Sequence, residues 1–156
     1  ALANILPSLQ CDIEIWLAGD GTERARLEQL VDDLGLRESV TFLGDYDSPE
    51  ELMSSVTLFV STSNYEGFGL AVAEAMAAGI PVIATDSGGV REVMGQTGCL
   101  VSVGDVLGLG GEIERHLACS DDELRSVGSL GAKRVSEKFS EVAWFERWTN
   151  IYEGTL

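Results

Sequence analysis

The chain has 156 residues, of which 45% are hydrophobic and 23% charged, and it shows no internal repeat or low-complexity tract. This length and composition are typical of one globular domain and exclude a disordered or solenoid protein. Its 26 acidic residues outnumber 10 basic ones, giving a formal net charge of −16. Because nucleic acids bind through clustered Lys and Arg side chains, this charge excludes a nucleic-acid partner. An acidic, lysine-poor surface is also typical of proteins from high-salt organisms, an alternative that the charge leaves open.

Residue types that bind metals or act as nucleophiles are scarce. Cys11, Cys99 and Cys119 lack CxxC spacing, and His116 is the only histidine. We therefore expect no metal site, no disulfide framework and no Ser-His-Asp triad. Free cysteines favour a cytoplasmic protein, and no apolar run is long enough to cross a bilayer.

Short β-rich runs alternate with helical patterns along the chain. Residues 1–7 are typical of the end of a helix that begins upstream. Helices are predicted over Thr22–Leu34 and Pro49–Ser55, and three more after Asp105. The predicted strands are Ile13–Leu17, Val40–Leu43, Leu58–Val60, Pro81–Ala84 and Cys99–Val101.

This alternation predicts an α/β fold, a Rossmann-like parallel sheet with helices on both faces. We expect one domain over residues 1–156. Ligands of such sheets bind beyond the carboxyl ends of the strands. The loops expected there are Gly19–Gly21, Gly44–Tyr46, Ser61–Gly69 and Asp86–Gly89.

The last predicted helix, over residues 140–156, has an apolar stripe. Its members are Trp144, Phe145, Trp148, Ile151 and Tyr152. Core packing is the simpler interpretation of this stripe, and docking on a further domain is the alternative.

The segment from Leu70 to Ala78 is predicted to be a helix in which only Glu74 is polar. We expect it to be buried on all sides, so that the Glu74 carboxylate needs a hydrogen-bonding partner. Glu74 lies about one turn inside the helix and its side chain tilts toward the N-terminus. Its two oxygens suit the vicinal hydroxyls of a ribose.

The loop before this helix is rich in glycine. Backbone N–H groups of Gly67, Phe68, Gly69 and Leu70 are predicted to bind a phosphate, which the glycines allow to approach closely. Glu66 would repel a phosphate, so its expected target is a sugar hydroxyl or a developing oxocarbenium charge. Stabilisation by the helix dipole is the alternative interpretation of Glu66.

These residues resemble a known family. The run from Glu66 through Gly67-Phe68-Gly69-Leu70 to Glu74, with seven residues between the two glutamates, resembles the E-x7-E signature of family 4 GT-B glycosyltransferases. Leu17–Gly21, Val40–Gly44 and Ala84–Glu92 resemble other segments of that family's nucleotide-binding half.

The resemblance implies a retaining hexosyltransferase that takes sugar from a nucleoside-diphosphate donor to make glycoconjugate, polysaccharide or glycolipid, without a metal or other cofactor. It implies that Glu74 holds the ribose and that Glu66, the candidate catalytic residue, lies beside the donor sugar. It also places Gly44 and Tyr46 near the base, and Gly19, Asp20 and Gly21 along the same cleft.

The chain departs from the family in two ways. The N-terminal domain that binds the acceptor is absent, so we expect the chain to be inactive alone and residues 140–156 to pack on that domain. The first strand of the nucleotide-binding half is also absent, with the basic residues that follow it. We expect its loss to distort the sheet, or to be filled by a partner strand or by a second copy in a homo-oligomer.

Two other functions stay open. The chain could be a non-catalytic nucleotide-binding or interaction module of the same fold, which titration with nucleotides would distinguish. A nucleotide-sugar epimerase is a third, less favoured interpretation. Localisation is expected to be cytoplasmic, with peripheral attachment to a membrane in the full-length protein as an open alternative.

Overall fold

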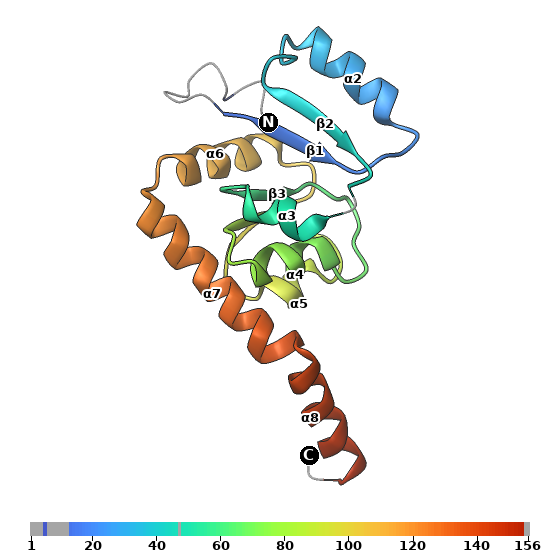
Figure 1. Ribbon diagram of the computed structural model, residues 1–156, viewed down its shortest axis with the longest axis vertical. Coiled ribbons are helices and arrows are strands. Elements are labelled where there is room, and N and C mark those ends of the chain that lie inside the picture. Colours follow the sequence, from blue (N-terminus) through green and yellow to red (C-terminus); the bar gives the residue numbers. More distant parts are fainter. Residues whose placement is uncertain (1–4, 6–12, 47, 155–156) are drawn as a thin grey trace. The chain divides into compact units, whose positions relative to one another are not determined.

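The computed structural model describes residue 5, residues 13–46 and residues 48–154 (Figure 1). Except for residue 5, the expected helix end at residues 1–7 lies outside the described residues, and so does Cys11. The chain divides into two compact units, Ala1–Glu51 and Leu52–Leu156. Each unit is described by itself.

The first unit contains a parallel strand pair and a helix. Strand β1 (Ile15–Ala18) leads into α2 (Arg24–Asp33) and then β2 (Val40–Gly44). The two strands pair in parallel, with Ile15 opposite Val40. Val31 is the buried residue of α2, whereas the other predicted core positions Leu27, Leu30 and Leu34 are 41%, 46% and 47% exposed.

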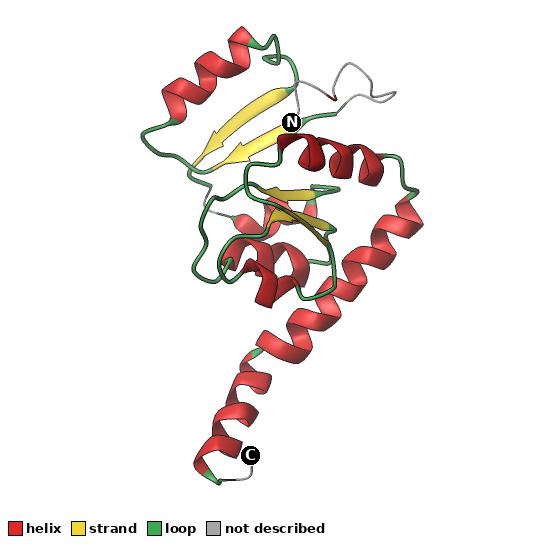
Figure 2. Cartoon of the chain, turned by 180° about the vertical axis from the view of Figure 1, so that it is seen from behind, coloured by secondary structure: helices red, strands yellow, loops and turns green. Residues whose placement is uncertain are grey.

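The second unit contains a three-stranded parallel sheet in the order β3 (Phe59–Ser61), β4 (Val82–Thr85), β5 (Cys99–Val101). Central strand β4 is buried at every residue. Helices α4 (Leu70–Ala77) and α5 (Val90–Met94) lie on one face and α6 (Val106–Leu117) on the other (Figures 1 and 2). Helix α3 (Pro49–Ser54) spans the boundary between the units.

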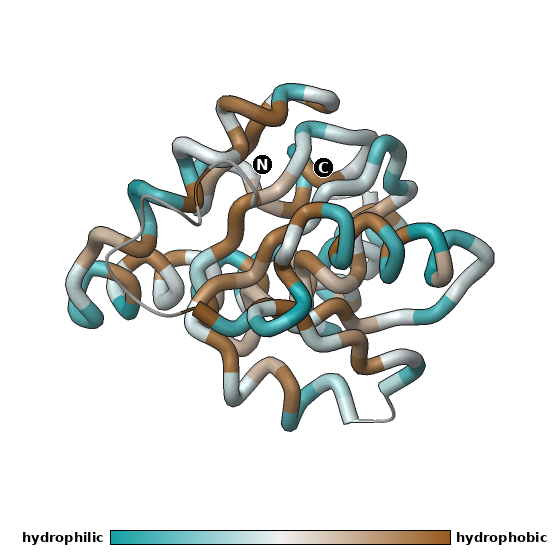
Figure 3. The backbone as a smooth tube through the Cα atoms, turned by 90° about the horizontal axis from the view of Figure 1, so that it is seen from above, coloured by the Kyte–Doolittle hydropathy of each residue, from teal (hydrophilic) through white to brown (hydrophobic). Residues whose placement is uncertain are grey.

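Apolar side chains from the sheet, α4 and α5 form the core of the second unit. Its largest fully buried members are Met76, Ile83 and Met94. Hydrophilic residues lie mainly on outer helical turns and in loops (Figure 3). No helix of the described part is both long and apolar enough to cross a membrane.

The predicted α/β class is confirmed, because parallel sheets carry helices on both sides and every predicted strand lies within two residues of an observed one. The strands nevertheless form two sheets. Within the described residues, β1 pairs with β2 alone and β3 with β4 alone. Among the described strands, one edge of β1 and one edge of β3 therefore have no paired strand. Whether another strand or a second copy fills that place stays a prediction.

Helix α7 (Asp121–Phe139) packs closely against α4 and α5. A Cβ at Gly128 would lie 1.8 Å from the Gly79 carbonyl oxygen, so only glycine permits this approach. Arg134 of α7 donates hydrogen bonds from Nε to the Val93 carbonyl at 2.7 Å and from its terminal nitrogen to the Glu92 carbonyl at 2.6 Å. These bonds cap the C-terminal end of α5 with a cation.

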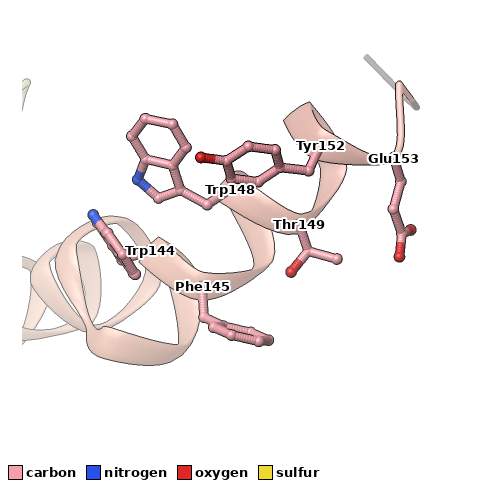
Figure 4. Close-up of a pocket in the computed structure, with 6 residues that line it drawn as sticks. All are labelled: Trp144, Phe145, Trp148, Thr149, Tyr152 and Glu153. Carbon is pink, nitrogen blue, oxygen red and sulfur yellow. The ribbon is translucent and has the colours of Figure 1, made fainter.

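Helix α8 (Glu141–Tyr152) follows α7 and extends away from the sheet (Figure 1). None of its residues is buried. The core interpretation of its apolar stripe is therefore wrong for this structure. Trp144, Trp148 and Tyr152 form a row with ring centroids 5.9 Å apart in each neighbouring pair (Figure 4). A shallow pocket lies among the side chains of Trp144, Phe145, Trp148, Thr149, Tyr152 and Glu153.

Replacement of Arg134 by methionine should lower the free energy of unfolding by about 1–3 kcal/mol, because two carbonyl groups lose a charged donor. Arg125→Met is the matched control, since Arg125 lies on the same helix in an exposed pair with Asp122. Such a pair contributes at most about 1 kcal/mol. Urea denaturation of both variants measures the difference, and equal midpoints would refute the capping role of Arg134.

Candidate functional site

Two loops meet at the carboxyl ends of neighbouring parallel strands in the second unit. Residues 62–69 follow β3 and residues 86–89 follow β4. This is the edge of a parallel sheet where ligands bind. The predicted loops Ser61–Gly69 and Asp86–Gly89 are therefore adjacent.

The two loops are in direct backbone contact. The N–H of Gly89 donates to the Glu66 carbonyl at 3.1 Å. A Cβ at Gly88 would lie 1.7 Å from the same oxygen, and a Cβ at Gly89 would lie 2.4 Å from the Gly67 carbonyl oxygen. Gly88 also has a φ of +53°, in the left-handed region. Both glycines are therefore required for the approach, and they fix the backbone of residues 66–67.

Glu66 is partly buried in this loop, and its carboxylate has a defined partner. The Ser63 hydroxyl donates to Glu66 Oε1 at 2.8 Å. The hydroxyl of Thr85, a buried residue at the end of β4, donates to the Ser63 carbonyl at 2.6 Å. Ser63 lies in the predicted loop Ser61–Gly69 but is not one of the individual site residues that the sequence predicts, and Thr85 lies outside the predicted loops.

The N-terminal end of α4 follows a glycine and has no side-chain cap among the described residues. Gly69 precedes the helix with a φ of +88° in the left-handed region, and a Cβ there would lie 3.1 Å from Val90 Cγ2. No side chain of the described residues caps the first turn. The first-turn N–H groups therefore retain their capacity to bind an anion.

Phe68 anchors the glycine-rich loop. Its ring contacts that of Phe139, at the end of α7, edge to face with centroids 5.5 Å apart. The Phe68 side chain thus attaches the loop to α7. The ligand contact predicted for Phe68 involves its backbone N–H and stays a prediction.

The predicted burial of α4 is wrong on one face. Val72, Ala73, Ala75 and Met76 are buried, but Glu74 is exposed. Leu70, Ala71, Ala77 and Ala78 are exposed on the same side. The Glu74 carboxylate therefore carries no desolvation cost and requires no buried partner within the described chain. What remains is an exposed carboxylate on an otherwise apolar helix face.

In the first unit, the structure brings together residues predicted from two separate loops. The Gly19 N–H donates to the Gly44 carbonyl at 2.8 Å. Asp20 Oδ1 accepts from the Gly21 N–H at 2.6 Å. Tyr46 lies just beyond, 41% exposed.

Arg24, which the sequence does not single out, lies beside this turn. A Cβ at Gly44 would be 3.2 Å from its guanidinium, which also contacts Asp20 at 3.5 Å and Glu28 at 2.9 Å. Its guanidinium lies 5.6 Å from the centroid of the Phe42 ring. The carboxylates of Asp20 and Glu28 hold the Arg24 side chain beside Gly44. Arg24 therefore supports the turn at Gly44.

Two other polar side chains near the second sheet, those of Arg91 and Cys99, have interactions within the chain. Arg91 donates to Asp86 Oδ1 at 2.9 Å, and this hydrogen bond raises the pKa of the guanidinium. Burial, with a smaller contribution from Glu112, raises the pKa of the Cys99 thiol to about 11. Cys99 therefore stays protonated at neutral pH and is a poor nucleophile.

Comparison with known proteins gives a family match. The model of the family described as "Glycosyl transferases group 1" matches residues 1–119. The chain is 37% identical, over its whole length, to the N-acetyl-alpha-D-glucosaminyl L-malate synthase of Bacillus anthracis, and covers 41% of that protein. It is 35% identical to the lipopolysaccharide core biosynthesis glycosyltransferase LpsE of Rhizobium meliloti, with 84% of this chain and 39% of LpsE covered. The chain thus spans about 40% of the length of these relatives.

Solved structures of GT-B glycosyltransferases share the fold. HepE from Anabaena, in complex with UDP-glucose, matches 98% of this chain and 44% of its own at a TM-score of 0.83 and 27% identity. A TarM variant from Staphylococcus aureus, in a complex that includes UDP, matches 97% of this chain and 31% of its own at a TM-score of 0.86 and 25% identity.

The contact between the two loops predicts that alanine destabilises the fold at Gly88 but not at Gly67. Gly88→Ala should destabilise the second unit by at least about 2 kcal/mol, because the new methyl group meets the Glu66 carbonyl and the backbone requires a positive φ. Gly67→Ala is the control, since a Cβ there meets nothing within 4 Å. Denaturant midpoints measure both, and a Gly88→Ala variant as stable as the unsubstituted chain would contradict the observed approach.

Proposed function

The chain belongs to the glycosyl transferases group 1 family, and we propose that it binds the nucleoside-diphosphate sugar from which a hexosyl group is transferred with retention of configuration. The products proposed are glycoconjugate, polysaccharide or glycolipid. The observation that carries this proposal is the uncapped N-terminus of α4 behind a glycine-rich loop, with one glutamate before it and another in its second turn.

The diphosphate is assigned to the glycine-rich loop and the N-terminal end of α4. The proposed ligands are the backbone N–H groups of Gly67, Phe68, Gly69 and Leu70. The helix that begins at Leu70 has no side-chain cap from the described residues, and the partial positive charge of its N-terminal end favours an anion there. A Cβ at Gly67 would meet no protein atom within 4 Å. The glycine is therefore not required by packing within the chain, which supports a close approach by a ligand.

The ribose is assigned to Glu74. Leu70 and Glu74 are four residues apart and share one helix face, so the Glu74 side chain points back toward the first turn. Because Glu74 is exposed, its carboxylate is available to two ligand hydroxyls. An exposed acid on a helix face of alanines and one leucine has no evident role in packing.

The transferred sugar is assigned to Glu66. Its carboxylate lies one residue before the proposed phosphate-binding backbone, where a direct phosphate contact would be repulsive. A sugar hydroxyl, or the positive charge that develops as the glycosidic bond breaks, is a favourable target. The proposed reaction needs no metal or other cofactor, and addition of EDTA to a transfer assay tests that expectation.

Donor binding by Gly19, Asp20, Gly21, Gly44 and Tyr46 stays a prediction, to be tested by single substitutions. The base is unassigned, but the complexes of HepE with UDP-glucose and of TarM with UDP support UDP as the first nucleotide to test. We propose a cytoplasmic setting, with peripheral membrane attachment as the alternative where the acceptor is a lipid.

Because the chain spans about 40% of its relatives' length, transfer itself is proposed only for a longer protein that also binds the acceptor. The exposed apolar stripe of α8 is proposed to pack on that remaining part. Chain-alone activity is not expected. An interaction module that binds no nucleotide is the competing function, and the same α8 surface favours it.

Calorimetric titration of the chain with UDP, GDP and ADP tests the proposal. Binding of one of them is expected, and Glu74→Gln should weaken it by about 10- to 100-fold, because charge-assisted hydrogen bonds to the ribose are lost. Glu146→Gln on α8 is the matched control, since it removes one exposed carboxylate far along the chain. We expect it to leave the affinity unchanged.

Two results would contradict the proposal. Failure of all three nucleotides to bind a folded chain would favour the interaction module. Equal affinity of the unsubstituted and Glu74→Gln chains would remove the ribose role while leaving nucleotide binding intact.

A further inference from the structure

We propose that Ser63 is a positioning residue, whose hydroxyl holds the Glu66 carboxylate in the orientation that contacts the donor sugar. The observation behind it is the chain of hydrogen bonds from Thr85 to Ser63 and from Ser63 to Glu66. This inference rests on the proposed function, in which Glu66 faces the sugar.

The Ser63 hydroxyl can orient only one of the two carboxylate oxygens. A serine hydroxyl carries one proton, and here it is donated to Glu66 Oε1 at 2.8 Å. Among the described residues, no second hydrogen bond to this carboxylate is found. Oε2 therefore stays available to a ligand hydroxyl while Oε1 is held.

Ser63 is itself held by the sheet. The Thr85 hydroxyl, on a residue 6% exposed at the end of β4, donates to the Ser63 carbonyl at 2.6 Å. Strand β4 is buried throughout, so this donor is fixed by the core. The backbone of Ser63, which carries the hydroxyl, is thus attached to the buried sheet of the second unit.

The backbone and the side chain of Glu66 are held by different bonds. Its carbonyl accepts from the Gly89 N–H at 3.1 Å, and its carboxylate accepts from Ser63. Loss of the Ser63 hydroxyl should therefore leave the loop in place and free only the side-chain torsions of Glu66. A glutamate side chain has several rotatable bonds, so ordering it on ligand binding has an entropic cost that the Ser63 bond removes in advance.

A purely structural role for Ser63 is the competing interpretation. The bond joins residues three apart within one loop, and it could simply stabilise the turn. The two roles differ in what they affect. If the bond is structural, its loss should change the stability of the loop and lower the affinities for UDP and for the UDP-sugar alike. If the bond positions Glu66, its loss should lower only the part of the affinity that comes from the sugar.

The test compares UDP with UDP-glucose, UDP-galactose and UDP-N-acetylglucosamine by calorimetry, and continues with the sugar nucleotide that binds tightest. Ser63→Ala should lower the affinity for that sugar nucleotide by about fivefold and leave the affinity for UDP unchanged. Ser63→Thr, which keeps a hydroxyl, should restore the affinity. Ser129→Ala is the matched control, because it removes a hydroxyl bonded at the same 2.8 Å on α7.

A double-mutant cycle separates positioning from an independent contact. If Ser63 acts through Glu66, the variant with both Ser63→Ala and Glu66→Gln should bind the sugar nucleotide as Glu66→Gln alone does. Melting temperatures of all variants establish that each is folded. Additive losses, equal losses for UDP and the sugar nucleotide, or no loss in Ser63→Ala would overturn the inference.

Failure of the two proposals gives different results. If the unsubstituted chain binds none of UDP, GDP and ADP, the proposed function fails and this inference fails with it. If UDP binds but no sugar nucleotide binds more tightly, or if Ser63→Ala has no selective effect, only the role of Ser63 is refuted.

Discussion

The candidate site depends on a backbone-to-backbone contact between the loops that follow β3 and β4. Gly88 and Gly89 lie so close to the carbonyl groups of Glu66 and Gly67 that neither position has room for a Cβ. This contact fixes the direction in which the chain enters α4. The left-handed Gly69 then completes the turn and leaves the first-turn N–H groups without a side-chain cap. An anion site at that helix end therefore follows from packing between neighbouring strands of a parallel sheet.

Local pattern was enough to predict the described strands and all the described helices from α2 onward except the short α5, because strand and helix periodicity are properties of short segments. Burial was harder to predict. The composition of α4 indicates an interior helix, yet the side bearing Leu70 and Glu74 is exposed. The apolar stripe of α8 is exposed as well, and the Trp144 side chain is 59% exposed. An apolar composition shows that a surface favours a partner, but it does not show whether that partner lies within the described chain.

The candidate site shows a similar division. Glu66 and the glycines after it could be found from the sequence because they are contiguous. Ser63 and Thr85 could not, because their bond joins residues 22 positions apart and requires the register of β3 against β4. The spacing of Ser63 three residues before Glu66 was the one local signal, and it is common in ordinary turns. Arg24 was hidden for the same reason, since its place beside Gly44 depends on strand pairing.

The two glutamates obtain their geometry by different means. Glu74 lies in a regular helix turn, so the backbone alone fixes where its side chain starts, and an exposed carboxylate can serve a ligand without further support. Glu66 lies in a loop, where no repeating backbone geometry directs the side chain. Its orientation depends on the hydroxyl of Ser63, a residue whose backbone carbonyl accepts a hydrogen bond from the buried Thr85. A loop residue that must be placed accurately therefore needs a connection to the core, and the bond from Thr85 to Ser63 provides it.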